Sequence, residues 1–161
     1  MTINTGEKIP SVKLRHMTKD GVKEITTDEI FKGKKVAIFG LPGAFTPTCS
    51  AKHLPGFVGH YDKLKAKGVD TIVCISVNDA FVMDAWGKNQ NVGDKVLMVA
   101  DGNADFTKAI GIEMDGTGYG MGLRMKRFSA YVVDGTVKSF NLEKPGSFEV
   151  SNAETMLGQV G

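Results

Sequence analysis

The stretch KVAIFGLPGAFTPTCSAKHLPGF, residues 35–57, decides how the chain is expected to fold. It begins with an apolar, β-branched run over 35–41 that lacks polar alternation, which is typical of a strand covered on both faces. A loop of Gly, Pro and Thr follows, and a helical pattern begins at about residue 47. Cys49 therefore lies just past the carboxyl end of a buried strand, where open α/β sheets leave a binding crevice.

The residues after Cys49 predict further helices and strands. Apolar residues recur at spacings of three and four up to Gly68, which predicts a helix over about 47–67 with a kink at Pro55 and Gly56. Two more apolar runs, 70–77 and 95–101, predict strands of the same buried kind. Between them Asn78 can cap a helix, and the sequence ADFTKAI predicts a short helix over 104–110.

Both ends of the chain carry antiparallel signals. Residues 11–26 alternate about a Lys-Asp-Gly turn and predict a β-hairpin, after which Thr27 can cap a short helix that ends at Gly33. Residues 127–143 form two strand-like runs about Asp134-Gly135, which is a strong hairpin signal. A glycine-rich segment, 111–122, is expected to be a flexible loop, and a last short helix is expected over 152–160.

Together these elements predict one domain that spans residues 1–161. Strands that alternate with helices and end in an antiparallel hairpin are typical of an α/β sandwich with a mixed sheet. We therefore predict a thioredoxin-like sandwich, in which helices flank a mixed central sheet, with an N-terminal β-hairpin extension. A composition that is 42% hydrophobic and 24% charged agrees with a soluble globular protein.

Composition also argues against several classes of partner. The formal charge of +2 comes from scattered Lys and Arg rather than from a charge block, so neither nucleic acid nor a membrane surface is an expected partner. No run is long enough for a membrane span, and the first ten residues lack the basic and apolar regions of a secretory signal. With only two cysteines, the expected compartment is the reducing cytoplasm, where free thiols persist.

Cys49 stands where a helix would stabilise a thiolate. Thr46 can act as N-cap and Pro47 suits the first helical position, so Cys49 occupies the third, close to unpaired backbone N–H groups and the positive end of the helix dipole. Helix N-termini and neighbouring cations favour the thiolate, which is the reactive form of cysteine. The alternative is that Cys49 is a small buried hydrophobic residue without a chemical role.

The sequence PGAFTPTCS, residues 42–50, resembles the PxxxTxxC motif of peroxiredoxins. The flanking sequences HLPGF, SVNDAFV and RFS are similar to the type II, or peroxiredoxin-5, subfamily, and the resemblance covers nearly the whole chain. It implies a thiol peroxidase that reduces hydrogen peroxide and small alkyl hydroperoxides through a sulfenic acid, with no metal, flavin or haem. A rival hypothesis is a redox-responsive sensor or chaperone-like binding protein that is switched by oxidation of the same cysteine.

The resemblance also implies roles for individual residues. Cys49 would be the peroxidatic nucleophile, Thr46 would contact the peroxide and the thiolate, and Pro42 would shape and shield the pocket. The sequence RxxRF places the family's arginine at Arg127, with Arg124 as a second, supporting candidate. A thiolate that attacks a peroxide pushes negative charge onto the departing oxygen, so fixed donors such as a guanidinium lower the barrier.

The route back to the thiol depends on Cys74. This residue lies inside a predicted buried strand, where burial makes a thiol inert, so packing is the favoured interpretation and a resolving role the weaker one. No cysteine follows Cys74, so a C-terminal resolving cysteine is not expected. We expect an external thiol to reduce the sulfenic acid, with glutaredoxin or glutathione favoured over thioredoxin. A Cys49–Cys74 disulfide would require local unfolding.

The remaining candidates receive structural interpretations. His53 shares a helix face with Cys49, as metal ligands can, but His60 lies too far along the helix to join them. Two ligands without an acidic third are a weak case for zinc, so His53 is expected to pack near the site mouth. Phe45, Phe81 and Trp86 are expected in the core or in a subunit contact. A homodimer is implied by the resemblance alone.

Overall fold

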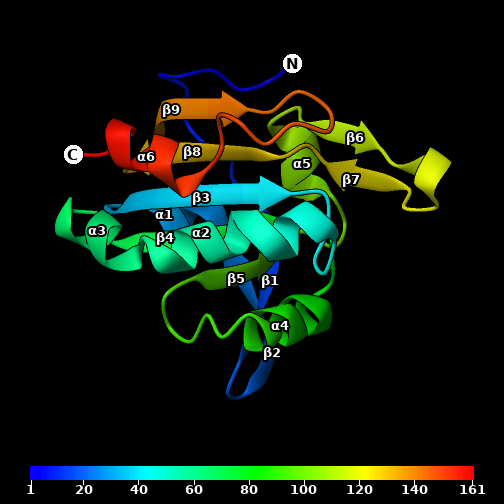
Figure 1. Cartoon of the computed structure of the whole chain (residues 1–161). Helices are drawn as coiled ribbons and strands as arrows, with labels where there is room; N and C mark the ends of the chain where they lie inside the picture. Colours follow the sequence, from blue (N-terminus) through cyan, green and yellow to red (C-terminus); the bar gives the residue numbers. More distant parts are fainter.

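The computed structural model describes residues 1–161 and is built around one seven-stranded sheet (Figure 1). The strand order is β2-β1-β5-β4-β3-β8-β9, in which β3, β4 and β5 are parallel and all other neighbours are antiparallel. The predicted mixed sheet is therefore confirmed. Its strands run as β1 Lys13–Thr18, β2 Gly21–Thr26, β3 Lys35–Leu41, β4 Thr71–Ser76, β5 Leu97–Ala100, β8 Phe128–Val133 and β9 Thr136–Leu142.

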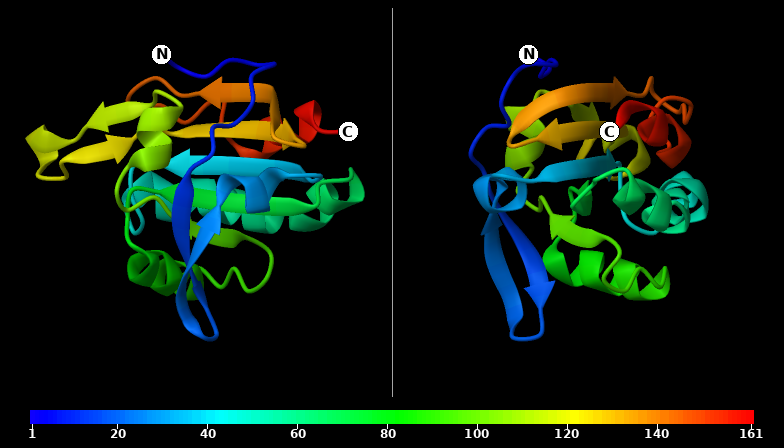
Figure 2. Two further views of the ribbon diagram at one scale, coloured as in Figure 1. Left: turned by 180° about the vertical axis from the view of Figure 1, so that it is seen from behind. Right: turned by 90° about the vertical axis from the view of Figure 1, so that its left-hand side faces the viewer.

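Helices cover both faces of this sheet, and the right-hand view of Figure 2 shows the larger group on one side. Alternate residues of β3 enter the two cores: Phe39 packs beneath α2, α3, α4 and α6, whereas Ile38 packs beneath α1 and α5. The run over 35–41 lacks polar alternation because both faces are buried. The helices are α1 Thr27–Phe31, α2 Leu54–Gly59, α3 Tyr61–Ala66, α4 Ala80–Asn89, α5 Asp105–Ala109 and α6 Ala153–Gln159.

The N-terminal hairpin extends the central sheet, as predicted. Strand β1 pairs with β2 along its whole length and lies antiparallel to β5, with Arg15 opposite Ala100. In Figure 1 the turn of this hairpin projects below the body of the protein. At the other end of the sheet, Asp134 and Gly135 join β8 to β9 with φ values of 48° and 79°. Two successive positive φ angles are the signature of the predicted two-residue hairpin turn.

The helix after Cys49 differs from the single kinked helix predicted over 47–67. A first turn begins at Pro47 and widens into a π-helix over Cys49–His53, in which the Leu54 N–H bonds to the Cys49 carbonyl. The wider turn accommodates Pro55, whose ring would clash with the carbonyl four residues earlier in a regular α-helix. The axis breaks at His60, between α2 and α3, rather than at Pro55 and Gly56.

Two predicted helix caps were wrong by one residue. The N-cap of α1 is Thr26, which forms a capping box with Glu29, because the Thr27 hydroxyl instead donates to the Pro10 carbonyl. The N-cap of α4 is Asp79, whose side chain accepts from the Val82 N–H. The residue predicted for that cap, Asn78, accepts hydrogen bonds from Ala44 N–H at 3.0 Å and from the Ser76 hydroxyl at 2.6 Å. Asn78 thus supports the loop before Cys49.

The glycine-rich segment 111–122 is more ordered than the predicted flexible loop. It contains strand β6, Glu113–Asp115, and a 3₁₀ turn, Thr117–Tyr119, and β6 pairs with β7, Leu123–Met125. This two-stranded arm projects from the sheet in both Figure 1 and Figure 2. Arg124 lies in β7, and Arg127 lies in the short link between β7 and β8. The arm therefore determines the positions of both arginines.

Candidate active site

Cys49 lies at the carboxyl end of β3, in the first turn of the helical segment, and its side chain is fully buried. The Arg127 guanidinium reaches it from the junction of β7 and β8 and donates a hydrogen bond through Nη2 to Cys49 Sγ at 3.1 Å. A fixed positive charge in contact with a buried sulfur stabilises negative charge there. The structure thus brings together the two residues that the sequence separates by 78 positions.

Arg127 is held in this orientation by a second contact. Its Nη1 donates to Nδ1 of His53 at 2.9 Å, and its guanidinium carbon lies 5.8 Å from the centre of the Phe148 ring. The other ring nitrogen of His53, Nε2, donates to the Ser151 carbonyl at 2.9 Å. One imidazole therefore accepts from Arg127 and donates to the backbone, which requires the neutral tautomer protonated at Nε2.

His53 was expected near the mouth of the site, and this prediction is wrong. Its side chain is fully buried, and its ring centre lies 4.8 Å from that of Phe39, with the two rings tilted by 48°. Burial, together with the charge of Arg127, lowers the pKa of His53 to about 3. The neutral form is thus maintained at any physiological pH.

The depressed pKa of His53 predicts a pH-dependent stability. Between its ordinary value of 6.5 and about 3, the unfolded chain binds a proton at His53 that the folded chain does not. The folded state therefore loses stability as the pH falls through this window. We expect His53→Asn to reduce that slope by about 1 kcal/mol per pH unit, measured as the free energy of unfolding in urea between about pH 7 and pH 4.

The matched control for this measurement is His16→Asn on β1. Solvent reaches His16 in the folded state, so this variant is expected to keep the wild-type slope. Identical slopes for His53→Asn and the wild type would contradict the assignment of His53 as a histidine buried in its neutral form.

Thr46 and Pro42 flank the site, as the sequence indicates. The Thr46 carbonyl accepts from Ser50 N–H, which places Thr46 at the predicted N-cap position. Its hydroxyl, however, donates to the Gly43 carbonyl at 2.7 Å instead of accepting from the helix. Pro42, Thr48 and Arg127 line a cavity of about 120 Å³. Arg127 is part of the wall of this small hollow, whereas Cys49 and Thr46 are not, and the hollow is the candidate entry for a peroxide.

Arg124 does not contact Cys49. Its Nε donates to the Met121 carbonyl at 2.9 Å, and its Nη1 lies 3.4 Å from the carbonyls of Pro42 and Val77. The guanidinium therefore joins the β6–β7 arm to the active-site loop and to the end of β4. Arg124 supports the shape of the loop, and Arg127 is the arginine at the sulfur.

Cys74 lies on β4 opposite Phe39 of β3 and is fully buried in the same core as Cys49. Both cysteines are free thiols. Burial raises the pKa of Cys74 well above its ordinary value, and the proximity of Cys49 raises it further, against a smaller lowering effect of Arg127. Cys74 is therefore held as the neutral thiol, which agrees with the packing interpretation.

Several residues of the site carry no signal in the local sequence. Ser151 and Phe148 contact His53, and the buried Glu143 lies in the same segment. These residues follow β9, more than 90 positions beyond Cys49, and only the tertiary fold brings them to the site. Of the three aromatic residues expected in the core or in a subunit contact, Trp86 is in the core and donates to the Ser50 hydroxyl at 3.0 Å.

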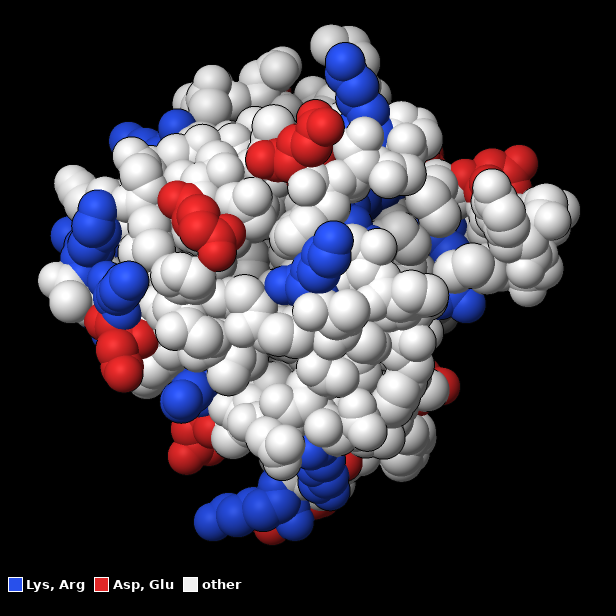
Figure 3. Space-filling model, viewed as in Figure 1, with Lys and Arg blue, Asp and Glu red and all other residues white.

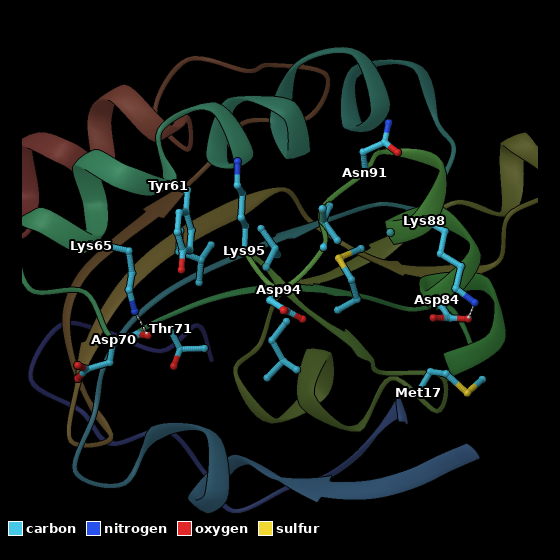
Figure 4. A pocket seen from close by; sticks show the side chains of 17 residues that line it. Met17, Tyr61, Lys65, Asp70, Thr71, Asp84, Lys88, Asn91, Asp94 and Lys95 are labelled. Carbon is cyan, nitrogen blue, oxygen red and sulfur yellow. Dashed lines mark hydrogen bonds and ion pairs between the residues drawn. The ribbon is translucent and has the colours of Figure 1, made fainter. Parts of the chain in front are cut away.

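A hollow of about 840 Å³ lies away from Cys49 between α3 and α4 (Figure 4). Its walls carry charges of both signs: Lys88 forms an ion pair with Asp84, and Lys65 donates a hydrogen bond to the backbone carbonyl of Asp70. No group of three or more His, Cys, Asp and Glu side chains is arranged to hold a metal ion. Volume alone does not select the candidate site, whereas a cysteine sulfur in contact with a cation does.

Charges are mixed over the face shown in Figure 3, where Lys and Arg alternate with Asp and Glu instead of forming one patch. None of the helices combines the length and the apolar character that crossing a membrane requires.

Comparison with known proteins tests the resemblance seen in residues 42–50. The Redoxin family matches residues 4–157. The chain is 46% identical over 160 residues to the chloroplastic peroxiredoxin-2E of Arabidopsis thaliana, covering 97% of this chain and 68% of that protein. It is 43% identical over 156 residues to peroxiredoxin-2D of the same plant, covering 96% of both.

Similar solved structures also belong to peroxiredoxins. Reduced Prx3 of Vibrio vulnificus in complex with H2O2 is 53% identical, covers 98% of each chain and superposes with a TM-score of 0.94. The 1-Cys peroxiredoxin described as an antioxidant protein of Plasmodium falciparum is 32% identical, covers 96% of each chain and has a TM-score of 0.89. The thioredoxin-like fold and the enzyme class predicted from the sequence are confirmed. The chain belongs to the redoxin family and is a peroxiredoxin, a thiol peroxidase among the oxidoreductases.

Proposed function

We propose that Cys49 reduces hydrogen peroxide and small alkyl hydroperoxides by direct attack of its thiolate. The observation that carries this proposal is the hydrogen bond from Arg127 to Cys49 Sγ at 3.1 Å. The sulfur attacks one peroxide oxygen and the O–O bond breaks. The second oxygen leaves with the bonding electrons and takes up a proton, giving water or an alcohol. Cys49 is then a sulfenic acid, and no metal, flavin or haem is needed.

The pocket favours small peroxides. Its volume of about 120 Å³ admits hydrogen peroxide or a short alkyl hydroperoxide beside Arg127 and Pro42. Pro42 and Arg127 both line this pocket, and the positive charge of Arg127 would stabilise the negative charge that develops on the departing oxygen. Thr46 stands at the same loop, and a rotation of its hydroxyl from the Gly43 carbonyl would direct it to a bound peroxide. Reduced Prx3 of Vibrio vulnificus, the similar protein compared above, forms a complex with H2O2 in its crystal structure.

We propose that a thiol from outside the chain reduces the sulfenic acid, with glutaredoxin or glutathione favoured and thioredoxin as the alternative. Cys74 is the only other cysteine of the chain. It is fully buried on β4, and burial holds it as the thiol. A disulfide between it and Cys49 would require both residues to leave a closed core.

The variant Cys74→Ser tests this route. We expect it to keep at least about half of the wild-type turnover with glutaredoxin and glutathione, because the external thiol attacks Cys49 directly. Turnover is measured as peroxide consumption at steady state, with thioredoxin in a parallel assay. Loss of turnover together with normal sulfenic acid formation would instead establish Cys74 as the resolving cysteine.

We extend the proposal to a cytoplasmic homodimer. Phe45 and Phe81 are 52% and 69% exposed, so the prediction that they lie in the core is wrong and the alternative, a subunit contact, is retained. Phe45 has a left-handed φ of 64° and lies 6.4 Å from Trp86, so the loop turns this aromatic ring outward. The proposal of a cytoplasmic location is based on the two free thiols alone. The relatives do not decide the compartment, because they include proteins named as chloroplastic and mitochondrial. Sedimentation of the reduced protein tests the dimer.

A further inference from the structure

The segment that joins β9 to α6, residues 143–151, forms a strap across the site. It is organised by one carboxylate oxygen: Glu143 Oε2 accepts from the N–H groups of Glu149, Val150 and Ser151 at 2.9, 2.9 and 2.8 Å. The Ser151 hydroxyl also donates to the same oxygen at 2.7 Å. Glu143 is 5% exposed, and no Lys, Arg or His forms an ion pair with it. The carboxylate thus binds the strap's own backbone.

The other end of the strap lies against the active site. The Ser151 carbonyl accepts from His53 Nε2, and the Phe148 ring packs edge-on to the His53 ring at 5.1 Å. Phe148 also lies beneath the Arg127 guanidinium. Glu143 fixes Ser151 through both its N–H and its hydroxyl. The strap therefore sets the position of the carbonyl to which His53 bonds.

We propose that Glu143 is a positioning residue for the peroxide reaction, acting through the strap and His53 to hold Arg127 against Cys49. The inference rests on the proposed function of Cys49. The Ser151 carbonyl can accept only from a protonated Nε2, so it leaves Nδ1 of His53 as an acceptor. Arg127 donates to that acceptor through Nη1, which directs Nη2 at the sulfur. Three hydrogen bonds in series therefore connect the strap to the nucleophile.

The charge of Glu143 matters for this arrangement. Burial alone would raise its pKa, but the hydrogen bonds from the Ser151 hydroxyl and the three backbone N–H groups lower it overall. Four donors lie within hydrogen-bond distance of Glu143 Oε2. A negatively charged carboxylate oxygen attracts such a cluster of donors more strongly than the neutral oxygen of an amide does. Glu143→Gln is therefore expected to loosen Ser151 while keeping the size of the side chain.

The chain offers a matched control in Glu149→Gln. Glu149 lies in the same strap, is exposed, and its carboxylate makes no hydrogen bond or ion pair. His53→Asn supplies the second arm. Its amide oxygen lies close to the place of Nδ1 and can still accept from Arg127, but the side chain is too short to reach the Ser151 carbonyl. In this variant the hydrogen bond between residue 53 and the strap is lost, while the one between residue 53 and Arg127 is kept.

The experiment is a double-mutant cycle on the rate at which hydrogen peroxide oxidises Cys49. The rate is followed in a stopped-flow instrument by the fluorescence of Trp86, the only tryptophan, which donates to the hydroxyl of Ser50 next to Cys49. We expect Glu143→Gln to slow oxidation by about tenfold and Glu149→Gln to leave it unchanged. In the His53→Asn background, Glu143→Gln should change the rate by less than about twofold.

The cycle separates positioning from stability. A purely structural role for Glu143 would lower the melting temperature and slow the reaction equally with or without His53, and this additive result would overturn the proposal. Should Glu143→Gln fail to fold, Glu143→Asp replaces it in the double-mutant cycle. Aspartate keeps the negative charge, but its side chain is shorter by one methylene, so the carboxylate no longer holds Ser151 in the same position. A wild-type protein whose Cys49 does not react with peroxide would refute the proposed function itself, which is a different outcome from additivity.

Discussion

Arg127→Gln is expected to slow the oxidation of Cys49 by peroxide by about 10²- to 10³-fold, as the loss of one fixed donor to a developing negative charge does in other enzymes. The substitution removes the hydrogen bond to Cys49 Sγ and its positive charge. It also leaves Nδ1 of His53 without its donor inside a closed core. The second-order rate with hydrogen peroxide, measured by stopped-flow fluorescence, checks this prediction.

Arg127→Lys distinguishes the effect of the positive charge from that of the two guanidinium nitrogens that donate in different directions. A lysine keeps a positive charge but carries a single nitrogen, so it cannot donate to Sγ and to His53 in the geometry of a planar guanidinium. We expect a rate between those of the wild type and Arg127→Gln, about tenfold below the wild type. Arg15→Gln, at an exposed ion pair with Glu24 on the hairpin, is the control and should not change the rate. A rate for Arg127→Gln within about twofold of the wild type would contradict the assigned role.

The elements that the sequence predicted well are those with a strong local cause. The run over 35–41 is apolar on both faces because β3 lies at the centre of the sheet, and Asp134-Gly135 supports two positive φ angles at a hairpin turn. By resemblance, the sequence RxxRF favoured Arg127 over Arg124, and Arg127 is the residue whose guanidinium contacts the sulfur in the structure. Local pattern thus predicted the fold, and the resemblance selected the arginine that lies at Cys49.

The misplaced features have a common physical origin. Thr26 and Thr27, like Asn78 and Asp79, are adjacent residues that can both cap a helix, and tertiary hydrogen bonds decide between them. The spacing of four residues places His53 on the face of Cys49, and both side chains contact Arg127 in the structure. The burial of His53 depends on Ser151 and Phe148, which come from a distant part of the chain and leave no trace in the helix spacing.

The support behind Arg127 could not be predicted from the sequence. The Glu143 carboxylate bonds mainly to backbone N–H groups, and Ser151 bonds to His53 through its backbone carbonyl, so their partners leave little signal in the sequence. Both residues lie 90 or more positions from His53 along the chain. A buried glutamate in a loop has no periodic pattern that separates it from an exposed one. Its role follows only from four donors that converge on one oxygen.

Cys49 is the sole residue expected to react with peroxide, and Cys49→Ser is expected to abolish the reaction. Serine keeps the size and the helix position, but its hydroxyl does not ionise near neutral pH and cannot be oxidised as a thiolate is. Both cysteines are buried, but only Cys49 accepts a hydrogen bond from Arg127, whereas burial raises the pKa of Cys74 and holds it as the thiol. Any peroxide consumption that remains should be no faster than that of a solution without protein.

The most direct measurement mixes the reduced protein with one equivalent of hydrogen peroxide in the absence of added thiol. A reagent that labels sulfenic acids is then added, and the modified residue is located by mass spectrometry. We predict one label per chain, on Cys49, unchanged in amount in Cys74→Ser and absent in Cys49→Ser. Peroxide consumption by Cys49→Ser at the wild-type rate, or a label found on Cys74 alone, would contradict the assignment of Cys49 as the reacting residue.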